Sequence, residues 1–230
     1  MHLLCLFALL CGLPADVDSA RLHALEKHYQ RARTLKAAFY QRYSDGKGPG
    51  TAESGTVYFS RPGRMRWDYE SPEQKVFLVD GKNVWFYVPA DRTASRAKLN
   101  ESSDWRTPLA LLTGKADLSH ICGTVEATNV DPYIGNKPGE STPAPAGTIF
   151  HCKPRSSSAA EGGAPSEIIF EADAEDRLVR VVIHEPGNVE TEFRFGNWEE
   201  NLPIPEATFH FAAPPGVAIV DEATLAGAMH

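Results

Sequence analysis

Two long parts of the sequence alternate apolar and polar residues with a period of two, and this alternation constrains the fold more than any other feature. A period of two places successive side chains on opposite faces of the chain, as in a β-strand. Around the Pro62-Gly63 pair, the residues that share a face are Val57, Phe59 and Arg61, followed by Met65, Trp67 and Tyr69. Residues 55–69 therefore predict two strands with a bulge or tight bend at Pro62-Gly63.

Further segments of the same kind extend the pattern into a sheet. Residues 75–79 and 83–88 flank Asp80-Gly81, a hairpin-type turn, so they continue a meander after residues 55–69. The other predicted strands are 148–152, 167–171, 177–184, 190–198 and 208–211. Because strands outnumber helices and most connections are short, we expect an α+β, mainly β chain with one strongly curved antiparallel sheet and helices packed against it.

Two segments predict those helices. Residues 21–40 carry apolar side chains at three- and four-residue spacing, which indicates an amphipathic helix. The stripe consists of Leu22, Leu25, Tyr29, Ala32, Leu35 and Phe39. Residues 107–114 begin with a Thr-Pro pair and end with Gly, around an apolar body that includes Leu109 and Leu112. These are the start and stop signals of a short helix.

The amino terminus has the composition of an export signal. Residues 3–13 are apolar and uncharged, and this run is far shorter than the roughly 20 residues of a transmembrane helix. Small residues follow at Ala15, Ser19 and Ala20, where a signal peptidase could cut. We therefore interpret residues 1–20 as a signal peptide and residues 21–230 as a single domain. A lipobox at Cys11 and a buried amino-terminal helix are the alternatives.

Two cysteines, Cys122 and Cys152, lie outside that signal, and both lie in segments that predict short strands. In an oxidising compartment such as the periplasm they can form a disulfide. The alternative is two separate thiols. The four cysteines of the chain include no C-x-x-C pair and have no metal-ligand spacing, so we expect no metal site.

Charge and motif content exclude several functions. A formal net charge of −7 is unsuited to binding nucleic acid, which requires clustered Lys and Arg. The sequence contains no G-x-S-x-G elbow, H-E-x-x-H pair or Gly-rich phosphate loop. His23 and His28 are spaced by five, which does not bring two ligands together on one helix face as a spacing of four does. No residue emerges as a catalyst, and we expect neither an enzyme nor a cofactor.

Large apolar side chains are concentrated in the first half of the chain. One sheet has one face to bury, and two modest helices leave part of such a curved face uncovered, which favours a hollow. The alternative is an ordinary packed core, which aromatic strands usually build. The residues expected to line the hollow are Phe39, Val57, Phe59, Met65, Trp67, Trp85, Tyr87, Leu109 and Leu112.

Arg61 is the exception in this apolar set. It shares a strand face with Val57 and Phe59, where a charge is costly unless it is hydrogen-bonded. An arginine at a strand end can extend its charged head to water, and the Pro62 that follows is compatible with this. Alternatively, its guanidinium holds a movable helix through carbonyl oxygens.

Several short motifs follow one another along the chain. They are Phe39-Tyr40-Gln41, Gly55, Arg61-Pro62, Trp67, Asp80-Gly81-Lys82, Trp85-Phe86-Tyr87, Thr107-Pro108, Phe209-His210-Phe211 and Pro214-Pro215-Gly216-Val217. Each is weak alone, but together they span residues 21–220 in a specific order. This order resembles the LolA family of periplasmic lipoprotein carriers.

This resemblance implies an incomplete antiparallel β-barrel with helices that cover its concave face as a lid. It also implies a monomer that binds the acyl chains of lipoproteins, receives them from an inner-membrane ABC transporter (LolCDE-like) and delivers them to an outer-membrane acceptor. By matching position, Arg61 would latch the lid and Met65 would lie in the cavity.

The chain departs from the family pattern at its cysteines and in a Pro/Ser/Gly-rich insert at 153–166. Two other interpretations share the same hollow: a periplasmic carrier of free lipid or glycolipid, and a stress sensor similar to RseB. Such sensors have a second domain, for which about 200 residues leave little room. A hydrolase would need an active-site cluster that the sequence does not show.

Overall fold

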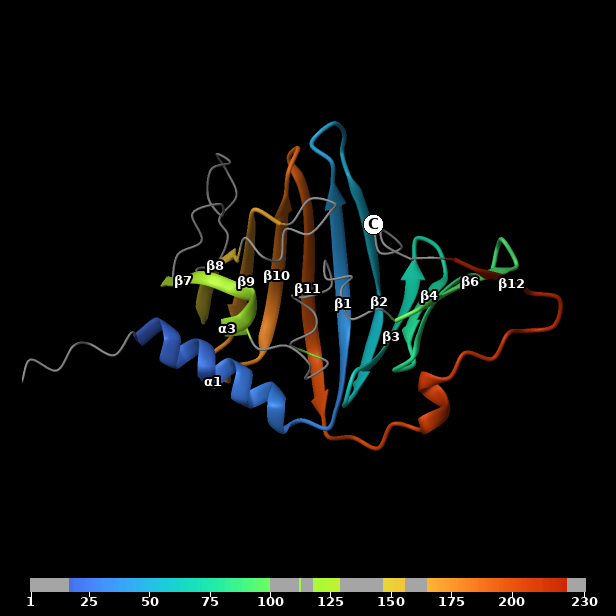
Figure 1. Ribbon diagram of the computed structural model, residues 1–230, viewed down its shortest axis with the longest axis horizontal. Helices are drawn as coiled ribbons and strands as arrows, with labels where there is room; N and C mark the ends of the chain where they lie inside the picture. The colour runs from blue at the N-terminus through green and yellow to red at the C-terminus, as the bar shows by residue number, and fades with distance from the viewer. Residues whose placement is uncertain (1–16, 100–111, 113–117, 129–146, 156–164, 223–230) are drawn as a thin grey trace, which may run out of the picture.

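One open, curved sheet forms most of the computed structural model, which describes residues 17–99, 112, 118–128, 147–155 and 165–222 (Figure 1). Twelve strands follow one another in the order β12-β6-β5-β4-β3-β2-β1-β11-β10-β9-β8-β7. All neighbours pair antiparallel except β12 and β6, which are parallel. The α+β, mainly β fold with a strongly curved sheet is therefore confirmed.

The strands are short to medium in length and mostly follow the meander that the alternation predicts. Their bounds are β1 Thr34–Ser44, β2 Thr51–Ser60, β3 Arg64–Ser71, β4 Lys75–Val79, β5 Asn83–Val88, β6 Thr93–Lys98, β7 Cys122–Thr128, β8 Thr148–Pro154, β9 Glu167–Ala172, β10 Leu178–Glu185, β11 Val189–Glu200 and β12 Ala218–Asp221. The described helices are α1 Val17–Arg31, α3 Leu118–Ile121 and the 3-10 helix η3 Glu206–Phe209.

The predicted helix over 21–40 is wrong in its second half, because α1 ends at Arg31 and β1 begins at Thr34. Leu35 and Phe39 are four residues apart, and an even spacing places two side chains on one face of a strand as well as on one side of a helix. Their segment pairs with β2 on one side and β11 on the other. Pairing on both sides favours the strand over the local helical pattern.

Two turns that the sequence predicts are confirmed by the structure. Residues 61–63 form the tight bend between β2 and β3, and Gly63 has a φ of 71°. At the β4–β5 hairpin, Gly81 has a φ of 96°, and the Asp80 carboxylate accepts hydrogen bonds from the backbone N–H groups of Lys82 (2.8 Å) and Asn83 (2.7 Å). Glycine adopts positive φ without steric cost, which explains its place at both turns.

The predicted last strand at 208–211 is also wrong. Residues 206–209 form η3, and the last strand is β12, which pairs with β6. Phe209 is buried with Leu78 and Trp85 on a face of β4 and β5. Both strands are already paired on each side, so a segment that crosses them cannot join the sheet there. The alternation at Phe209 and Phe211 therefore arises because their side chains pack on the outer surface of the sheet, and not because their backbone pairs with a strand.

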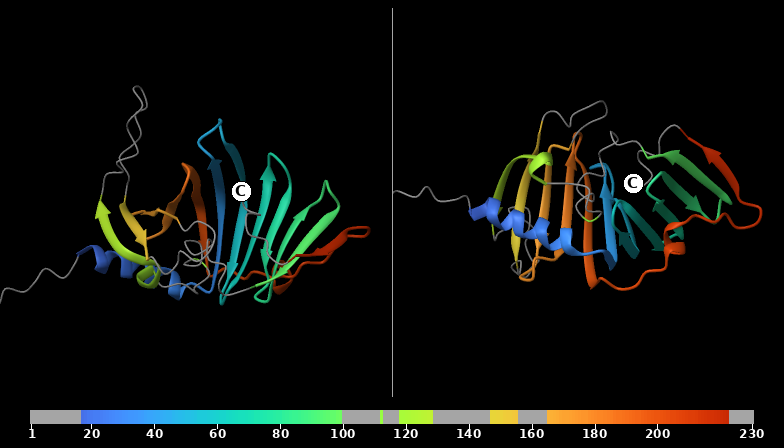
Figure 2. Two further views of the ribbon diagram at one scale, coloured as in Figure 1. Left: turned by 45° about the horizontal axis from the view of Figure 1, so that its top comes forward. Right: turned by 60° about the horizontal axis from the view of Figure 1, so that its bottom comes forward.

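Helices α1 and α3 pack on the inner face of the sheet, which we define as the face that α1 crosses (Figure 2). Leu22, Leu25 and Tyr29 of α1 are buried in the same core as Leu118 of α3. The predicted helix at 107–114 lies outside the described residues, except for Leu112, which is helical and buried in this core. Val17 to Ala20, which the sequence interpretation assigned to the signal, form the first turn of α1.

Several polar contacts attach α1 to the rest of the molecule. The backbone N–H of Leu178 donates to the Tyr29 hydroxyl (2.7 Å), and His28 Nε2 lies 2.8 Å from a carboxylate oxygen of Glu200. Arg21 also donates to the Thr148 hydroxyl at 2.8 Å. The buried carboxylate of Glu26 accepts the backbone N–H of Leu118, which joins α1 to α3.

A disulfide joins Cys122 at the start of β7 to Cys152 in β8. The two residues are thirty positions apart, and both side chains are buried in the inner core. Cys122 directly follows α3. The bond therefore fixes the end of this helix to the edge of the sheet.

The outer face carries charged groups where the inner face is apolar. The Glu192 carboxylate is 3% exposed and accepts hydrogen bonds from Arg180 (2.7 Å), Arg194 (2.9 Å) and Arg42 (3.2 Å). Burial acts to raise the pKa of Glu192, but these arginines outweigh it and the pKa lies below its ordinary value. Three guanidinium groups thus compensate for a carboxylate withdrawn from water.

The close approach of β2 and β3 at Gly55 generates a stability prediction. A β carbon added there would lie 1.9 Å from the carbonyl oxygen of Asp68, so the paired backbones would have to separate. We expect Gly55→Ala to lower the free energy of unfolding by about 3 kcal/mol, measured by urea denaturation. Gly48→Ala is the control, because no atom lies within 4 Å of its added β carbon. Equal stability of the two variants would contradict this explanation.

The attachment of α1 through Tyr29 generates a second prediction. Tyr29→Phe removes the hydroxyl that accepts the buried N–H of Leu178, which should cost about 1–3 kcal/mol in the free energy of unfolding. Amide hydrogen exchange in α1 should also become faster. The control is Tyr40→Phe, since Tyr40 is 41% exposed. Unchanged exchange in α1 would show that this hydrogen bond does not hold the helix.

Candidate functional site

The inner face of β1, β2 and β3 carries a tightly packed apolar group that we call the inner cluster. Its members are Phe39, Val57, Phe59, Met65 and Trp67. They are between 0% and 5% exposed. All five were expected to line a hollow, and the structure brings them together in one core.

Strand register explains this grouping. Val57 pairs with Trp67, and Phe59 pairs with Met65, so each apolar residue of β2 has an apolar neighbour on β3. On β1, Phe39 lies on the same face and contacts Trp67 edge to face, with ring centroids 4.8 Å apart. The period of two that predicts the strands also places these side chains side by side.

Trp67 lies at the centre of the inner cluster. Besides Phe39, its ring meets those of Phe193 (5.5 Å), Phe59 (6.1 Å) and Phe195 (6.1 Å), measured between centroids. Phe193 and Phe195 belong to β11, so one indole ring connects side chains of four neighbouring strands. Offset and edge-to-face contacts of this kind contribute energy beyond the area that they bury.

Apolar residues of the helices are buried in the same continuous core as the inner cluster. Leu22 and Leu25 of α1, Leu112, and Leu118 and Ile121 of α3 are buried in this core. Separating these helices from the sheet would expose a continuous apolar surface of strands and helices. The arrangement can therefore shield apolar groups from water once the helices move aside.

Arg61 lies in the turn after β2, beside the connection between α1 and β1. Its backbone N–H donates to the carbonyl oxygen of Arg33 at 3.0 Å, and its side chain is half-buried. Burial lowers the pKa of its guanidinium, and the nearby Tyr29 hydroxyl of α1 opposes that shift. Arg61 is thus placed where α1 approaches the inner cluster.

The prediction is wrong for Trp85 and Tyr87, which lie on the outer face of β5. Trp85 stacks on Phe211 with centroids 4.8 Å apart, and Tyr87 meets the same ring at 5.5 Å. Val84 and Phe86 take the inner positions instead. Because β5 is apolar at almost every position, its alternation cannot identify the inner face. The sequence feature that could have identified the outer face of β5 is the aromatic pair near the carboxyl end, which covers that face.

The two leucines expected from the helix at 107–114 have different outcomes. Leu112 is fully buried against the inner cluster. Leu109 lies outside the described residues, so its place in the cavity stays a prediction.

Sequence reasoning missed four polar residues that adjoin the inner cluster. This group, which we call the polar cluster, consists of Gln41, Glu53, Tyr69 and Lys75. The Tyr69 hydroxyl donates to Gln41 Oε1 at 2.8 Å, and Lys75 Nζ lies 2.6 Å from Glu53 Oε1. Burial raises the pKa of Tyr69, and the Glu53 carboxylate adds to the shift. The inward positions of Tyr69 in β3 and of Lys75 in β4 could have indicated it.

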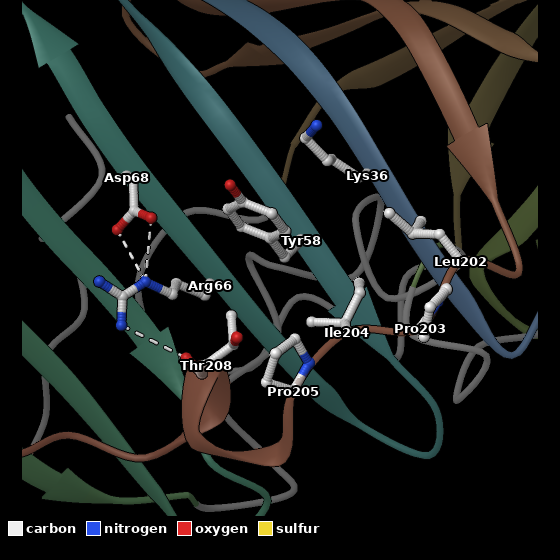
Figure 3. A pocket seen from close by; sticks show the side chains of 9 residues that line it. All are labelled: Lys36, Tyr58, Arg66, Asp68, Leu202, Pro203, Ile204, Pro205 and Thr208. Atoms are coloured by element: carbon white, nitrogen blue, oxygen red, sulfur yellow. Dashed lines mark hydrogen bonds and ion pairs between the residues drawn. The ribbon is translucent and has the colours of Figure 1, made fainter.

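A groove of about 420 Å³ lies on the other face, between the sheet and the segment after β11 (Figure 3). It is lined by Lys36, Tyr58, Arg66, Asp68, Leu202, Pro203, Ile204, Pro205 and Thr208. Arg66 Nε donates to both oxygens of Asp68 (2.8 and 3.0 Å) and its Nη1 donates to the carbonyl oxygen of Thr208 (3.3 Å). These contacts hold the carboxyl-terminal segment onto the sheet, so we interpret the groove as a structural junction.

The described residues contain no group of three or more His, Cys, Asp and Glu side chains that could hold a metal ion. No helix among them has the length and apolarity needed to cross a membrane.

Similarity to known proteins agrees with this geometry. The family described as outer membrane lipoprotein carrier protein LolA matches residues 30–131. The outer-membrane lipoprotein carrier protein of Nitrosospira multiformis is 25% identical over 222 residues, which cover 95% of this chain and 97% of the relative. That of Chromobacterium violaceum is 28% identical over 222 residues, 93% of each chain.

A crystal structure of an uncharacterized conserved protein from Thermus thermophilus has a TM-score of 0.51 at 14% identity. The match covers 89% of this chain and 98% of that protein, and at this identity the likeness shows the fold alone. Similarity in sequence to outer-membrane lipoprotein carrier proteins extends over nearly the whole chain, and residues 30–131 match the LolA family.

Proposed function

We propose that this protein carries lipoproteins through the periplasm by shielding their acyl chains on the inner face of its sheet. It would receive them from an inner-membrane ABC transporter (LolCDE-like) and deliver them to an outer-membrane acceptor, as a monomer and without a chemical step. The observation that carries the proposal is the inner cluster, an apolar surface of three strands closed by helices.

The physical need for such a shield is large. Exposure of acyl chains to water costs about 0.8 kcal/mol per CH₂, so one long chain costs on the order of 10 kcal/mol. Side chains such as Phe59 and Trp67, which are fully buried in this structure, offer an apolar surface to such a chain. A carrier without cargo must cover this surface, and α1 and α3 do so here.

Closure of the helices gives the protein a way to release cargo. An acyl chain that enters this core must displace helix side chains such as Leu25 and Leu118, which are buried in it. Loss of these helix–sheet contacts costs free energy and so opposes binding. The contacts form again when the cargo leaves, which favours release. Arg61 would strengthen the closed state, because it lies against the α1–β1 connection and near Tyr29.

Export to the periplasm agrees with the apolar amino terminus and the disulfide between Cys122 and Cys152. Among the small residues where a signal peptidase could cut, Ala15 precedes α1, whereas Ala20 lies inside its first turn. Cleavage after Ala15 would leave α1 whole. Sequencing of the amino terminus of the exported protein identifies the site.

Tryptophan fluorescence can test which face binds acyl chains. Trp67 lies in the inner cluster and Trp85 on the outer face. With a lipopeptide whose acyl chains carry bromine, a fluorescence quencher, we expect Trp67→Phe to remove most of the bromine-dependent quenching. The matched variant Trp85→Phe should retain it. Loss of quenching in Trp85→Phe alone would place the acyl chains on the wrong face for this proposal.

The latch can be tested by transfer kinetics. Arg61→Leu removes the guanidinium, so the closed state should weaken by about 1.5 kcal/mol and release of lipoprotein to an acceptor should slow by about tenfold. Arg64→Leu is the control, since Arg64 lies in the same turn region but pairs with Glu206 and stacks over Phe209 on the outer face. A normal transfer rate for Arg61→Leu would refute the latch.

A carrier of free lipid is the second candidate, because an apolar inner face serves either cargo. Native mass spectrometry of the protein purified from a periplasmic extract separates the two. A co-purified acylated lipoprotein is the expected result. Free lipid alone would support the alternative.

A further inference from the structure

We propose that the polar cluster of Gln41, Glu53, Tyr69 and Lys75 is a subsite for the ester and amide carbonyls that join acyl chains to their polar head. The inference rests on the proposed function, and it adds a recognition element that the apolar surface alone does not provide. The subsite would bind neutral hydrogen-bond acceptors beside the chains.

The four side chains form one connected unit. Lys75 Nζ lies 2.6 and 2.8 Å from the two carboxylate oxygens of Glu53, and 4.4 Å from the centroid of the Tyr69 ring. Tyr69 in turn donates its hydroxyl proton to Gln41. The aromatic ring of Tyr69 therefore links an ion pair to an amide.

These groups are withdrawn from water to an unusual degree. Gln41 is 1% exposed, Tyr69 3% and Lys75 8%. Lysine is among the residues that are least often buried, because its ammonium loses strong hydration. Within the described part of the chain, the Glu53 carboxylate compensates for it.

Strand register places the polar cluster directly beside the inner cluster. Phe39 pairs with Gly55, Gly55 pairs with Tyr69, and Tyr69 pairs with Lys75, so these four positions form one row across the sheet. The rings of Phe39 and Tyr69 meet edge to face with centroids 5.0 Å apart. An acyl chain lying on the inner cluster would thus have a polar boundary at one end.

A purely structural role explains this group poorly. Replacing a buried ion pair by apolar residues of similar volume is often neutral or stabilising, so Lys75 and Glu53 contribute little that an apolar pair could not. The neighbouring inward residues, Phe77 and Phe86, are apolar. A binding role gives the buried charges a purpose that packing does not.

The chemistry of the cluster selects its ligand. The ammonium has three N–H donors, and Glu53 provides one carboxylate for them among the described residues, so Lys75 can also donate to a ligand oxygen. The cluster has no net charge, and Glu53 would repel a carboxylate or phosphate. Ester and amide carbonyls are neutral and only accept hydrogen bonds. Burying one without a donor costs about 1–3 kcal/mol, which makes a donor at the end of the acyl site useful.

The test compares ester with ether lipids. One pair of probes is a peptide with dipalmitoyl-glyceryl-cysteine and its dialkyl-ether analogue, and a second pair is phosphatidylglycerol in diester and diether form. We expect the wild-type protein to bind a diester about tenfold more tightly than its diether. In Glu53→Gln/Lys75→Met this ratio should fall to about one.

The outer face supplies a matched control. Lys36 pairs with Glu199 at 2.6 Å, so Lys36→Met/Glu199→Gln removes the same chemistry from the opposite side and should keep the tenfold ratio. Tyr69→Phe removes one hydroxyl and should lower the ratio partially, which provides a second variant if the double variant does not fold.

Each result has a separate meaning. A preference for the diester in either probe pair supports the subsite, and the pair that shows it identifies lipoprotein or phospholipid as the source of the carbonyls. Equal binding of ester and ether by the wild-type protein overturns the subsite while the carrier function stands. Failure of the wild-type protein to bind any of the four lipids overturns both.

Discussion

The structure depends on the need to cover an apolar face on a single curved sheet. No second sheet packs against it in the described part of the chain, so Trp67 and its neighbours must be buried by helices. Helices attached by a few contacts can leave more easily than a sheet can, because strand pairing joins every residue of a strand to its neighbours. Under the proposed function, the strands are the rigid part of the fold and the covering helices are the part that moves.

Much of the fold could be predicted because strands have the simplest periodicity. The turn at 61–63 and the hairpin at Asp80-Gly81 carried local signals that tertiary structure did not overrule. Prediction failed where one spacing of apolar residues is compatible with two kinds of secondary structure. Leu35 and Phe39 fit a helix and a strand equally well, and only pairing with β2 and β11 decides between them. Such pairing joins distant residues, which a local pattern cannot reveal.

The residues of the candidate site also divide into those that the sequence could predict and those that it could not. Phe59 and Trp67 could be predicted because their strands have one apolar face, whereas Trp85 could not because both faces of β5 are apolar. The Lys75–Glu53 pair brings together two strands that are not neighbours in the sheet, β4 and β2. Its existence depends on the reach of both side chains across the intervening strand β3, which residue type alone does not encode.

The segment from residue 201 to 217 has a mechanical consequence. It leaves β11 near the middle of the strand order and ends at β12 on one edge, crossing the outer face on the way (Figure 1). Along this path Arg64 pairs with Glu206, and Phe209 is buried against the sheet. A segment that is held at both ends and along its path limits how far the strands beneath it can move relative to one another. This half of the sheet is thus braced on its outer face, and under the proposed function changes in the volume above the inner face are left to the helices.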